Sequence, residues 1–459
     1  MAAHDDDAVI AAGYKPQLQR SIGLFSSFAV SFSFISVLTG VFANYGFVLT
    51  KAGPFGIWSW WLVAIGHTLV ACVFGEMAGR IPLTGCAYNW NNQLASPFVG
   101  WFTGWMTLFL YSVGVAAVVA AMMPALQSLF GVTFDANAQR AIGAAIILVM
   151  AAINIYGMRV AAHTNTYAVI AEIVALIGFG LILLAATVIK GHPNFEFMTH
   201  VPDSPKPYLP GFLMACLLGS WTLLCFEGAA DVSEETVNVR YVAPRGIIFS
   251  MLVGSVLGFI FLSEITLAIP NVAAVTASSD PLSFIMVHYL GDMMTKIFLV
   301  FVVVAMFACA LINMTGAARV LFAIARDRRF IASRLFKKIS SHRVPARGIW
   351  LVTIVSIGFI LLADTATALY GAGAVLGAIV YLTTVLSFAF GVRKLPKTSS
   401  FSLGVWHWPA IILASLWLVI EIGILTIPEE FHPVAHATAG ILVVGFLLYF
   451  IVGRKRRNV

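Results

Sequence analysis

The sequence predicts an all-α integral membrane protein with twelve transmembrane helices. Its 459 residues are 60% hydrophobic and only 10% charged, and the mean hydropathy is +0.94. Soluble domains are about a quarter charged, so this composition excludes a soluble enzyme, a nucleic-acid-binding protein and a disordered chain. Apolar stretches recur along the whole chain, and the basic residues gather in alternate connections between them.

Twelve apolar stretches approach the length of about 20 residues that a helix needs to cross a bilayer. Their hydrophobicity is continuous rather than alternating, which favours helices over barrel strands. The predicted spans are 22–49, 58–78, 98–123, 141–157, 167–189, 209–230, 246–269, 297–322, 349–362, 367–392, 405–427 and 437–452.

The basic residues predict the orientation of these spans. If the N-terminus is cytoplasmic, almost every Lys and Arg lies on the cytoplasmic side, as the positive-inside rule requires. The exceptions are Lys51, Arg140, Lys190, Lys206 and Lys296. We therefore expect a multi-pass protein of the plasma (inner) membrane with both termini in the cytoplasm. The basic tail 454–459 could also contact anionic lipid.

Spans one and six differ from the others because polar and small residues interrupt them. Span one reads SFSFISVLTGVF over 31–42, and span six continues as LLCFEGAADVSEET over 223–236. Helices break at membrane depth only where the freed peptide groups line a cavity or meet protein. Two interrupted helices that open successive five-helix blocks predict an inverted-repeat transporter.

This pattern divides the chain into four parts. A cytoplasmic tail (1–21) precedes a transport core (22–392), in which helices one to five and six to ten form the two repeats. Helices eleven and twelve (393–453) and the basic tail (454–459) follow.

Two carboxyl groups inside the spans are functional candidates, since an ionisable residue in the membrane is costly unless it is paired. Glu172 lies in span five and could exchange protons or contact a cation; alternatively, it is protonated and bonded to a helix carbonyl. Glu227 lies in the span-six interruption and could meet an ammonium group. It could instead pair with Arg240 or Arg245 near the cytoplasmic boundary.

For the remaining ionisable residues we expect structural roles. Glu76 and Arg80 have the i, i+4 spacing of a helical ion pair, and His67 reads as a satisfied buried histidine. Snorkelling or an outer vestibule accounts for Glu264, Asp364 and Glu421.

Cofactor and metal signals are weak. The five cysteines have no paired spacing, and His432 with His436 is a single pair in an outer loop. Metal sites need more ligands than this, so we expect no metal, no cofactor and no enzymatic activity.

Four segments resemble the amino acid–polyamine–organocation transporter superfamily. They are the interruption Leu38-Thr39-Gly40-Val41-Phe42, the segment EMAGRIPLTGCAY from Glu76 to Tyr88, the segment from Phe226 to Pro244 with its Glu-Glu pair, and the segment from Arg319 to Pro345 that contains IARDRRF. The resemblance covers nearly the whole chain and is nearest to the gamma-aminobutyrate and choline permease branch. It implies twelve helices, a five-plus-five inverted core and a substrate held between spans one and six.

The resemblance also implies site residues. In span one the backbone amides would bind a carboxylate, and in span six the carbonyls, the Glu227 carboxylate and an aromatic lid would surround an amine. These residues are Ser36, Val37, Leu38, Thr39, Gly40, Cys225, Phe226, Glu227, Gly228 and Ala229. Glu172 falls where some relatives place a lysine in place of a sodium ion, and its opposite charge puts that coupling role in doubt.

The sequence therefore predicts a secondary active transporter that imports a small amine-bearing solute, such as the amino acid gamma-aminobutyrate, by alternating access. Proton coupling is favoured because Thr315 is followed by Gly316 rather than by a second hydroxyl residue suited to sodium. Polyamine or choline transport, amino acid exchange and a non-transporting membrane sensor are the alternatives. The expected partners are substrate, protons and membrane lipid, and not nucleic acid.

Overall fold

The computed structural model describes residues 10, 20–156, 158–190, 193–201, 207–342, 344–363, 365–395 and 400–453, without the side chains of 158–164 and 394. Most of the N-terminal tail, the basic tail 454–459 and Asp364 lie outside the described residues. The predictions made for those positions are therefore not addressed by the structure.

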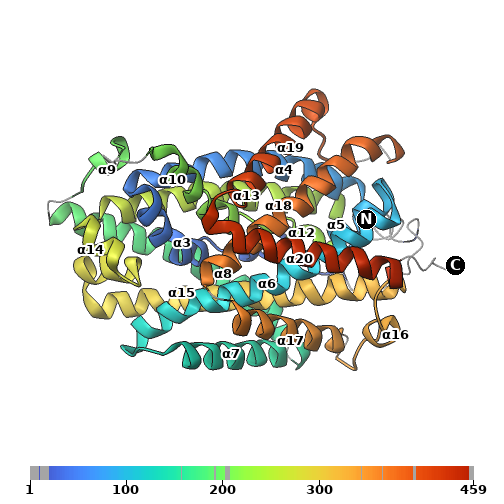
Figure 1. The fold of residues 1–459 in the computed structure, drawn as a ribbon, viewed down its shortest axis with the longest axis horizontal. Helices are drawn as coiled ribbons and strands as arrows, with labels where there is room; N and C mark the ends of the chain where they lie inside the picture. Colours follow the sequence, from blue (N-terminus) through green and yellow to red (C-terminus); the bar gives the residue numbers. More distant parts are fainter. Residues whose placement is uncertain are drawn as a thin grey trace.

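The described chain is built from helices, as predicted, joined by short connections (Figure 1). The α-helices are α2 (Leu24–Ile35), α3 (Val37–Ala52), α4 (Ser59–Arg80), α5 (Cys86–Leu94), α6 (Pro97–Phe130), α7 (Ala136–Tyr156), α8 (Met158–Ile189), α9 (Glu196–Thr199), α10 (Tyr208–Ala215), α11 (Leu217–Thr222), α12 (Gly228–Asp231), α13 (Val239–Leu267), α14 (Val272–Ala277), α15 (Pro281–Arg326), α16 (Ser333–Phe336), α17 (Ala346–Leu362), α18 (Ala366–Gly391), α19 (His407–Ile424) and α20 (His432–Leu448). Short 3-10 turns follow several of them, including η1 (Pro54–Trp58) before α4 and η2 (Ser233–Glu235) after α12.

Ten helical segments of the described chain are long and apolar enough to cross a membrane. Two shorter apolar helical segments, Tyr208–Thr222 and Ala346–Leu362, coincide with predicted spans six and nine. Span six is short because its helix stops at the interruption. The all-helical membrane fold is thus confirmed, while the count of twelve crossings stays a prediction.

The connecting helices sort to the two ends of the bundle. Figure 1 shows α9 and α14 at one end, and α5 and α16 at the other. The sequence places the first two on the outer side and the other two on the cytoplasmic side, so their grouping is consistent with the predicted order of crossings.

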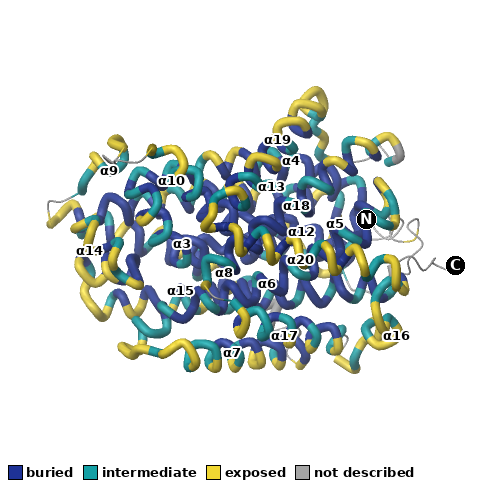
Figure 2. The backbone as a smooth tube through the Cα atoms, in the orientation of Figure 1, coloured by how far each residue is buried: buried dark blue, intermediate teal, exposed yellow. Residues whose placement is uncertain are grey.

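Burial is concentrated in the middle of the bundle, around α3, α6, α12 and α18 (Figure 2). The exposed surface of the peripheral helices is instead apolar, with side chains such as Leu148, Ile354, Leu413 and Val444 about half exposed or more. Such residues are stable on an outer surface when the surrounding solvent is lipid.

Gly391 allows α18 to end against the backbone of α5. A Cβ atom at Gly391 would lie 2.4 Å from the carbonyl oxygen of Leu94. Main-chain atoms held in a helix cannot move aside easily, so this position tolerates only glycine. By contrast, a Cβ atom at Gly358 on α17 would meet no atom within 4 Å.

We predict that Gly391→Ala lowers the free energy of unfolding by about 1–3 kcal/mol, the usual effect of overpacking. Gly358→Ala is the matched control and should stabilise slightly, because alanine favours a helix over glycine. Thermal unfolding of the purified protein in detergent measures both. Equal unfolding temperatures for the two variants would contradict the close packing of α18 on α5.

Candidate functional site

Span one is interrupted at a single residue, Ser36. It adopts the left-handed conformation (φ 32°, ψ 83°) between α2, which ends at Ile35, and α3, which begins at Val37. This conformation is uncommon for residues other than glycine. Since the first N–H groups of a helix have no partner within it, the break turns the first amides of α3 toward neighbouring groups at mid-depth.

A carboxylate from α8 meets these amides. Glu172 Oε1 accepts hydrogen bonds from the Ser36 hydroxyl at 3.0 Å and from the Leu38 N–H at 3.1 Å. The Glu172 side chain is only 2% exposed. A negative group at a helix N-terminus is stabilised by the helix dipole, so Glu172 holds the break and takes one of the amides that the resemblance assigns to a substrate carboxylate.

Span six is interrupted over 223–227, between α11 and α12. Within this segment Cys225 has a positive φ of 61°. Its N–H donates to the Tyr381 hydroxyl oxygen at 2.7 Å, and the same hydroxyl donates to Glu227 Oε2 at 2.5 Å. One phenol of α18 therefore fixes both the backbone and the carboxylate of the break.

Turns within the break already use several of its peptide groups. The Cys225 carbonyl accepts from the Gly228 N–H at 3.1 Å, and the Glu227 carbonyl accepts from the Ala230 N–H at 2.7 Å. The Ala229 N–H donates to Ser31 Oγ of α2 at 2.7 Å. These bonds tie the two interrupted spans to each other, and a substrate would have to compete with them.

The interruptions lie slightly before the predicted positions, which is a correction. The sequence predicts free backbone groups over 36–40 and 225–229, yet residues 37–40 belong to α3 and residues 228–229 belong to α12. The glycines serve close packing instead: a Cβ atom at Gly40 would lie 1.9 Å from Thr222 Oγ1, and one at Gly228 would lie 2.5 Å from the Phe34 ring.

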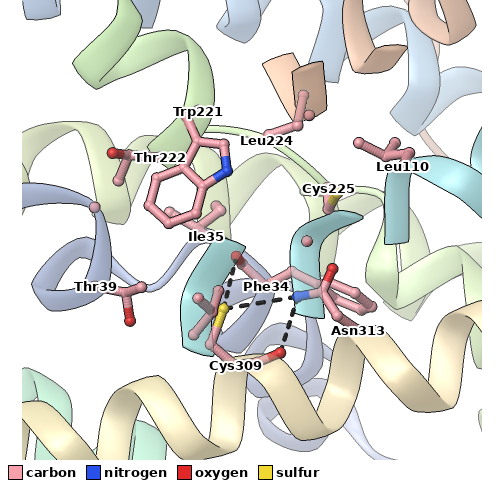
Figure 3. Close-up of a pocket in the computed structure, with 14 residues that line it drawn as sticks. Phe34, Ile35, Thr39, Leu110, Trp221, Thr222, Leu224, Cys225, Cys309 and Asn313 are labelled. Carbon is pink, nitrogen blue, oxygen red and sulfur yellow. Dashed lines mark hydrogen bonds between the residues drawn. The ribbon is translucent and has the colours of Figure 1, made fainter. Parts of the chain in front are cut away.

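A small cavity of about 30 Å³ lies between the two interrupted spans (Figure 3). This volume holds only one or two water molecules. Fourteen residues line it: Phe34, Ile35, Thr39, Gly40, Leu110, Gly114, Val118, Trp221, Thr222, Leu224, Cys225, Cys309, Asn313 and Gly373. The helices must therefore separate before a solute the size of an amino acid can enter.

Of the site residues predicted from the sequence, the cavity wall contains Thr39, Gly40 and Cys225. Ser36, Val37, Leu38, Glu227, Gly228 and Ala229 lie in or beside the two breaks but outside this wall. Phe226 is fully buried in an aromatic cluster, with its ring centroid 4.9 Å from that of Tyr381 and 5.8 Å from that of Phe74.

The aromatic residues at the cavity are Phe34 and Trp221, which sequence reasoning missed, and they replace Phe226 in that place. Trp221 stands two residues before the break, and its ring centroid lies 4.5 Å from that of the Tyr370 ring, with the two ring planes tilted by 39°. Asn313 also lines the cavity, and its amide nitrogen donates to the Cys309 carbonyl at 2.8 Å. The sequence signal that could have identified Trp221 as a cavity residue is its position just before the interruption of span six.

The predictions for the other ionisable residues are confirmed for the ion pair of span two and corrected for two acids predicted to lie in the outer part of their spans. The predicted Glu76–Arg80 ion pair is present. Glu421, predicted to snorkel or line a vestibule, is instead 1% exposed, and both of its carboxylate oxygens lie 3.0 Å from His67 Nε2. Glu264 is also buried, at 6% exposure. Adjacent helices pack over these positions, which the sequence pattern along one helix does not reveal.

Two interrupted apolar helices that meet around a small cavity define a transporter-type membrane protein. Residues 22–450 match the family model described as amino acid permease, and the chain belongs to this family, within the amino acid–polyamine–organocation superfamily. It is accordingly a permease and not an enzyme.

The chain is similar to several curated proteins over most of its length. It is 26% identical to the amino-acid permease BAT1 of Arabidopsis thaliana, over 91% of this chain and 87% of the relative. It is 25% identical to the branched-chain amino acid permease BcaP of Lactococcus lactis, over 92% of both chains. A putative polyamine transporter of Candida albicans is 24% identical, over 92% of this chain and 81% of the relative.

We predict that Tyr381→Phe destabilises the protein by about 1–3 kcal/mol, because a buried N–H and a buried carboxyl both lose a partner. Tyr370→Phe is the control, since the contact of Tyr370 with this site is its ring against Trp221. Thermal unfolding in detergent compares the two variants. A smaller loss for Tyr381→Phe than for Tyr370→Phe would contradict the role of the phenol in holding the break.

Proposed function

We propose that this amino acid permease is a secondary active transporter that imports a small amine-bearing solute, with gamma-aminobutyrate as the leading candidate. It works by alternating access in the plasma membrane, with both termini cytoplasmic. Residues 22–392 form the five-plus-five inverted core, and 393–453 form two additional helices. The observation that carries this proposal is the pair of helix breaks beside one small cavity.

The cytoplasmic end of the site is closed by contacts between the start of span one and the segment after span six. The Arg20 guanidinium donates to the Ser233 and Thr236 carbonyls at 3.2 and 2.7 Å, and Arg319 pairs with Glu235 at 3.0 Å. In the proposed cycle these bonds break when the site opens to the cytoplasm.

Buried carboxyl groups favour an amine on the substrate. Glu172, Glu227 and Asp231 all lie at the two breaks with 3% exposure or less. Asp231 is held by the Tyr111 hydroxyl at 2.7 Å, and Glu227 by Tyr381. A carboxylate in a low-dielectric site gains more from a nearby cation than it would in water, so an ammonium group is the natural ligand.

A polyamine or another organic cation is the second candidate. Glu172 already occupies part of the α3 N-terminus, where the resemblance places a substrate carboxylate. A ligand without a carboxylate needs no displacement of Glu172. The relative named as a putative polyamine transporter supports keeping this alternative.

Protons are the proposed driving ion. Glu172 and Glu227 are buried carboxyl groups that could bind and release a proton during the cycle. The Thr315 hydroxyl, the candidate sodium ligand in span eight, donates to Asn154 Oδ1 at 2.7 Å, and Gly316 offers no second hydroxyl.

We predict that proteoliposomes accumulate labelled gamma-aminobutyrate when an inward proton gradient is imposed without sodium. Accumulation should fall to the passive level when the gradient is abolished, and preloaded unlabelled substrate should support counterflow. Putrescine and leucine are the comparison solutes. Preferential accumulation of putrescine would select the second candidate, and no solute-dependent counterflow would contradict transport altogether.

We further predict that Glu227→Gln reduces uptake of the cationic probe putrescine at least tenfold, because the neutral amide no longer offsets the buried ammonium charge. Glu264→Gln, which also neutralises a buried carboxyl but lies outside the breaks, is the control and should transport normally. Retained uptake with an unchanged KM in Glu227→Gln would overturn the assignment.

A further inference from the structure

His67 of α4 connects the break of span six to a helix outside the ten-helix core. Its Nδ1 lies 2.6 Å from the Leu223 carbonyl oxygen, at the first residue of the break. Its Nε2 lies 3.0 Å from each carboxyl oxygen of Glu421 on α19. The side chains of His67 and Glu421 are each only 1% exposed.

Glycines allow these three elements to come so close together. A Cβ atom at Gly66 would lie 2.3 Å from the Trp417 ring of α19, and one at Gly219 would lie 2.8 Å from Val63 Cβ of α4. The helices α4, α11 and α19 are therefore in close contact on either side of His67. His67 therefore lies in a space whose width is fixed by the packing of these helices.

The hydrogen-bond chemistry requires a proton between His67 and Glu421. A carbonyl oxygen only accepts, so Nδ1 must carry hydrogen to bond with Leu223. If Nε2 carried none and Glu421 were ionised, a lone pair would face two anionic oxygens. The contact is favourable only if one further proton is present, as an imidazolium facing a carboxylate or as an imidazole facing a carboxylic acid.

We propose that His67 and Glu421 form a buried one-proton site that locks the break of span six through the Leu223 carbonyl. With this proton the His67–Glu421 pair is neutral overall. Nε2 and the Glu421 carboxyl are then joined by a hydrogen bond. Without the proton it carries a buried negative charge and loses the Nε2 contact, which is strongly unfavourable in a site without water. Repulsion between the Nε2 lone pair and the ionised Glu421 then displaces the imidazole ring, which withdraws Nδ1–H from the Leu223 carbonyl and frees Leu223 to move.

Neighbouring groups act on this site from several elements. Glu227 of the break acts on His67 through its charge, and the Tyr381 ring of α18 lies 6.2 Å from the His67 ring. The Cys216 thiol at the start of α11 lies near Glu421. In the part of the chain that the structure describes, no lysine or arginine forms an ion pair with Glu421 or Glu227. The proton is therefore the available positive charge.

This proton site goes beyond the proposed function, in which Glu172 and Glu227 carry the coupling proton. In this proposal α19 also acts on the transport core, because its Glu421 carboxyl controls the hydrogen bond between His67 and the Leu223 carbonyl. The proposed proton site does not depend on the identity of the solute or on the direction of its transport. It can therefore be tested without a substrate.

Cys225 is a natural reporter, since it lies within the break and is only 5% exposed. The full-length protein is reconstituted in liposomes with Cys72, Cys86, Cys216 and Cys309 replaced by alanine. The rate of Cys225 modification by a small membrane-permeant maleimide is then measured from about pH 6 to about pH 9, the range in which a histidine-linked proton is exchanged.

Glu421→Gln is the decisive variant. Its amide can donate to Nε2 of a neutral His67, so the lock stays closed and cannot lose a proton. Glu264→Gln is the matched control. Dividing each rate by that of Glu421→Gln at the same pH removes the intrinsic pH dependence of the thiol. An equilibrium that depends on the loss of one proton changes by up to tenfold per pH unit. We therefore expect this ratio to rise about tenfold or more across the range for the parent protein and for Glu264→Gln.

A ratio that stays constant with pH would overturn the proposal, because the pair would then be a fixed structural contact. Hydrogen exchange over 217–231, measured by mass spectrometry with all native cysteines present, provides a second measurement that needs no variant. After correction for intrinsic exchange, protection that falls between about pH 6 and about pH 9 supports the lock. Unchanged protection rejects it, even if Glu421→Gln fails to fold.

Discussion

Peptide groups released at mid-membrane need partners, and this constraint organises the centre of the protein. No water in the hydrocarbon region can bond to an interrupted helix. For the Leu38 N–H, just after the Ser36 break, the partner is the Glu172 carboxylate; for the Cys225 N–H it is the Tyr381 phenol, and for the Leu223 carbonyl it is the His67 ring. Each partner comes from another helix, so the breaks exist only because the bundle is assembled around them.

The same arrangement suits a protein that must change shape. Side-chain partners can exchange one backbone group for another, or for a substrate, at a smaller cost than breaking a continuous helix. The cavity of about 30 Å³ and the bonds between residues 20–22 and 233–237 fit one state of the proposed transport cycle. Glycines at close contacts, such as Gly40 against Thr222, let the moving parts touch without side chains between them.

Several buried acids surround this region, and their partners differ in kind. Glu76 is neutralised by Arg80, whereas Glu172, Glu227 and Asp231 are bonded to hydroxyl groups or backbone amides. Hydroxyls and amides can bond to an acid in either charge state more easily than a guanidinium can. The acids at the breaks are therefore the ones suited to gaining and losing charge, and Glu76 is the one suited to a fixed role.

The membrane class, the order of the apolar helices and the two interrupted spans follow from the sequence alone, because hydrophobicity and helix-breaking composition act locally. It also indicated Glu172 and Glu227, since charges among apolar residues stand out in any window. The assembled bundle is needed to show that the first break falls at Ser36, that Phe34 and Trp221 rather than Phe226 line the cavity, and that Glu421 meets His67. The reason is physical: each of these depends on which side chains from distant helices arrive within bonding distance, and helical periodicity carries no information about the partner.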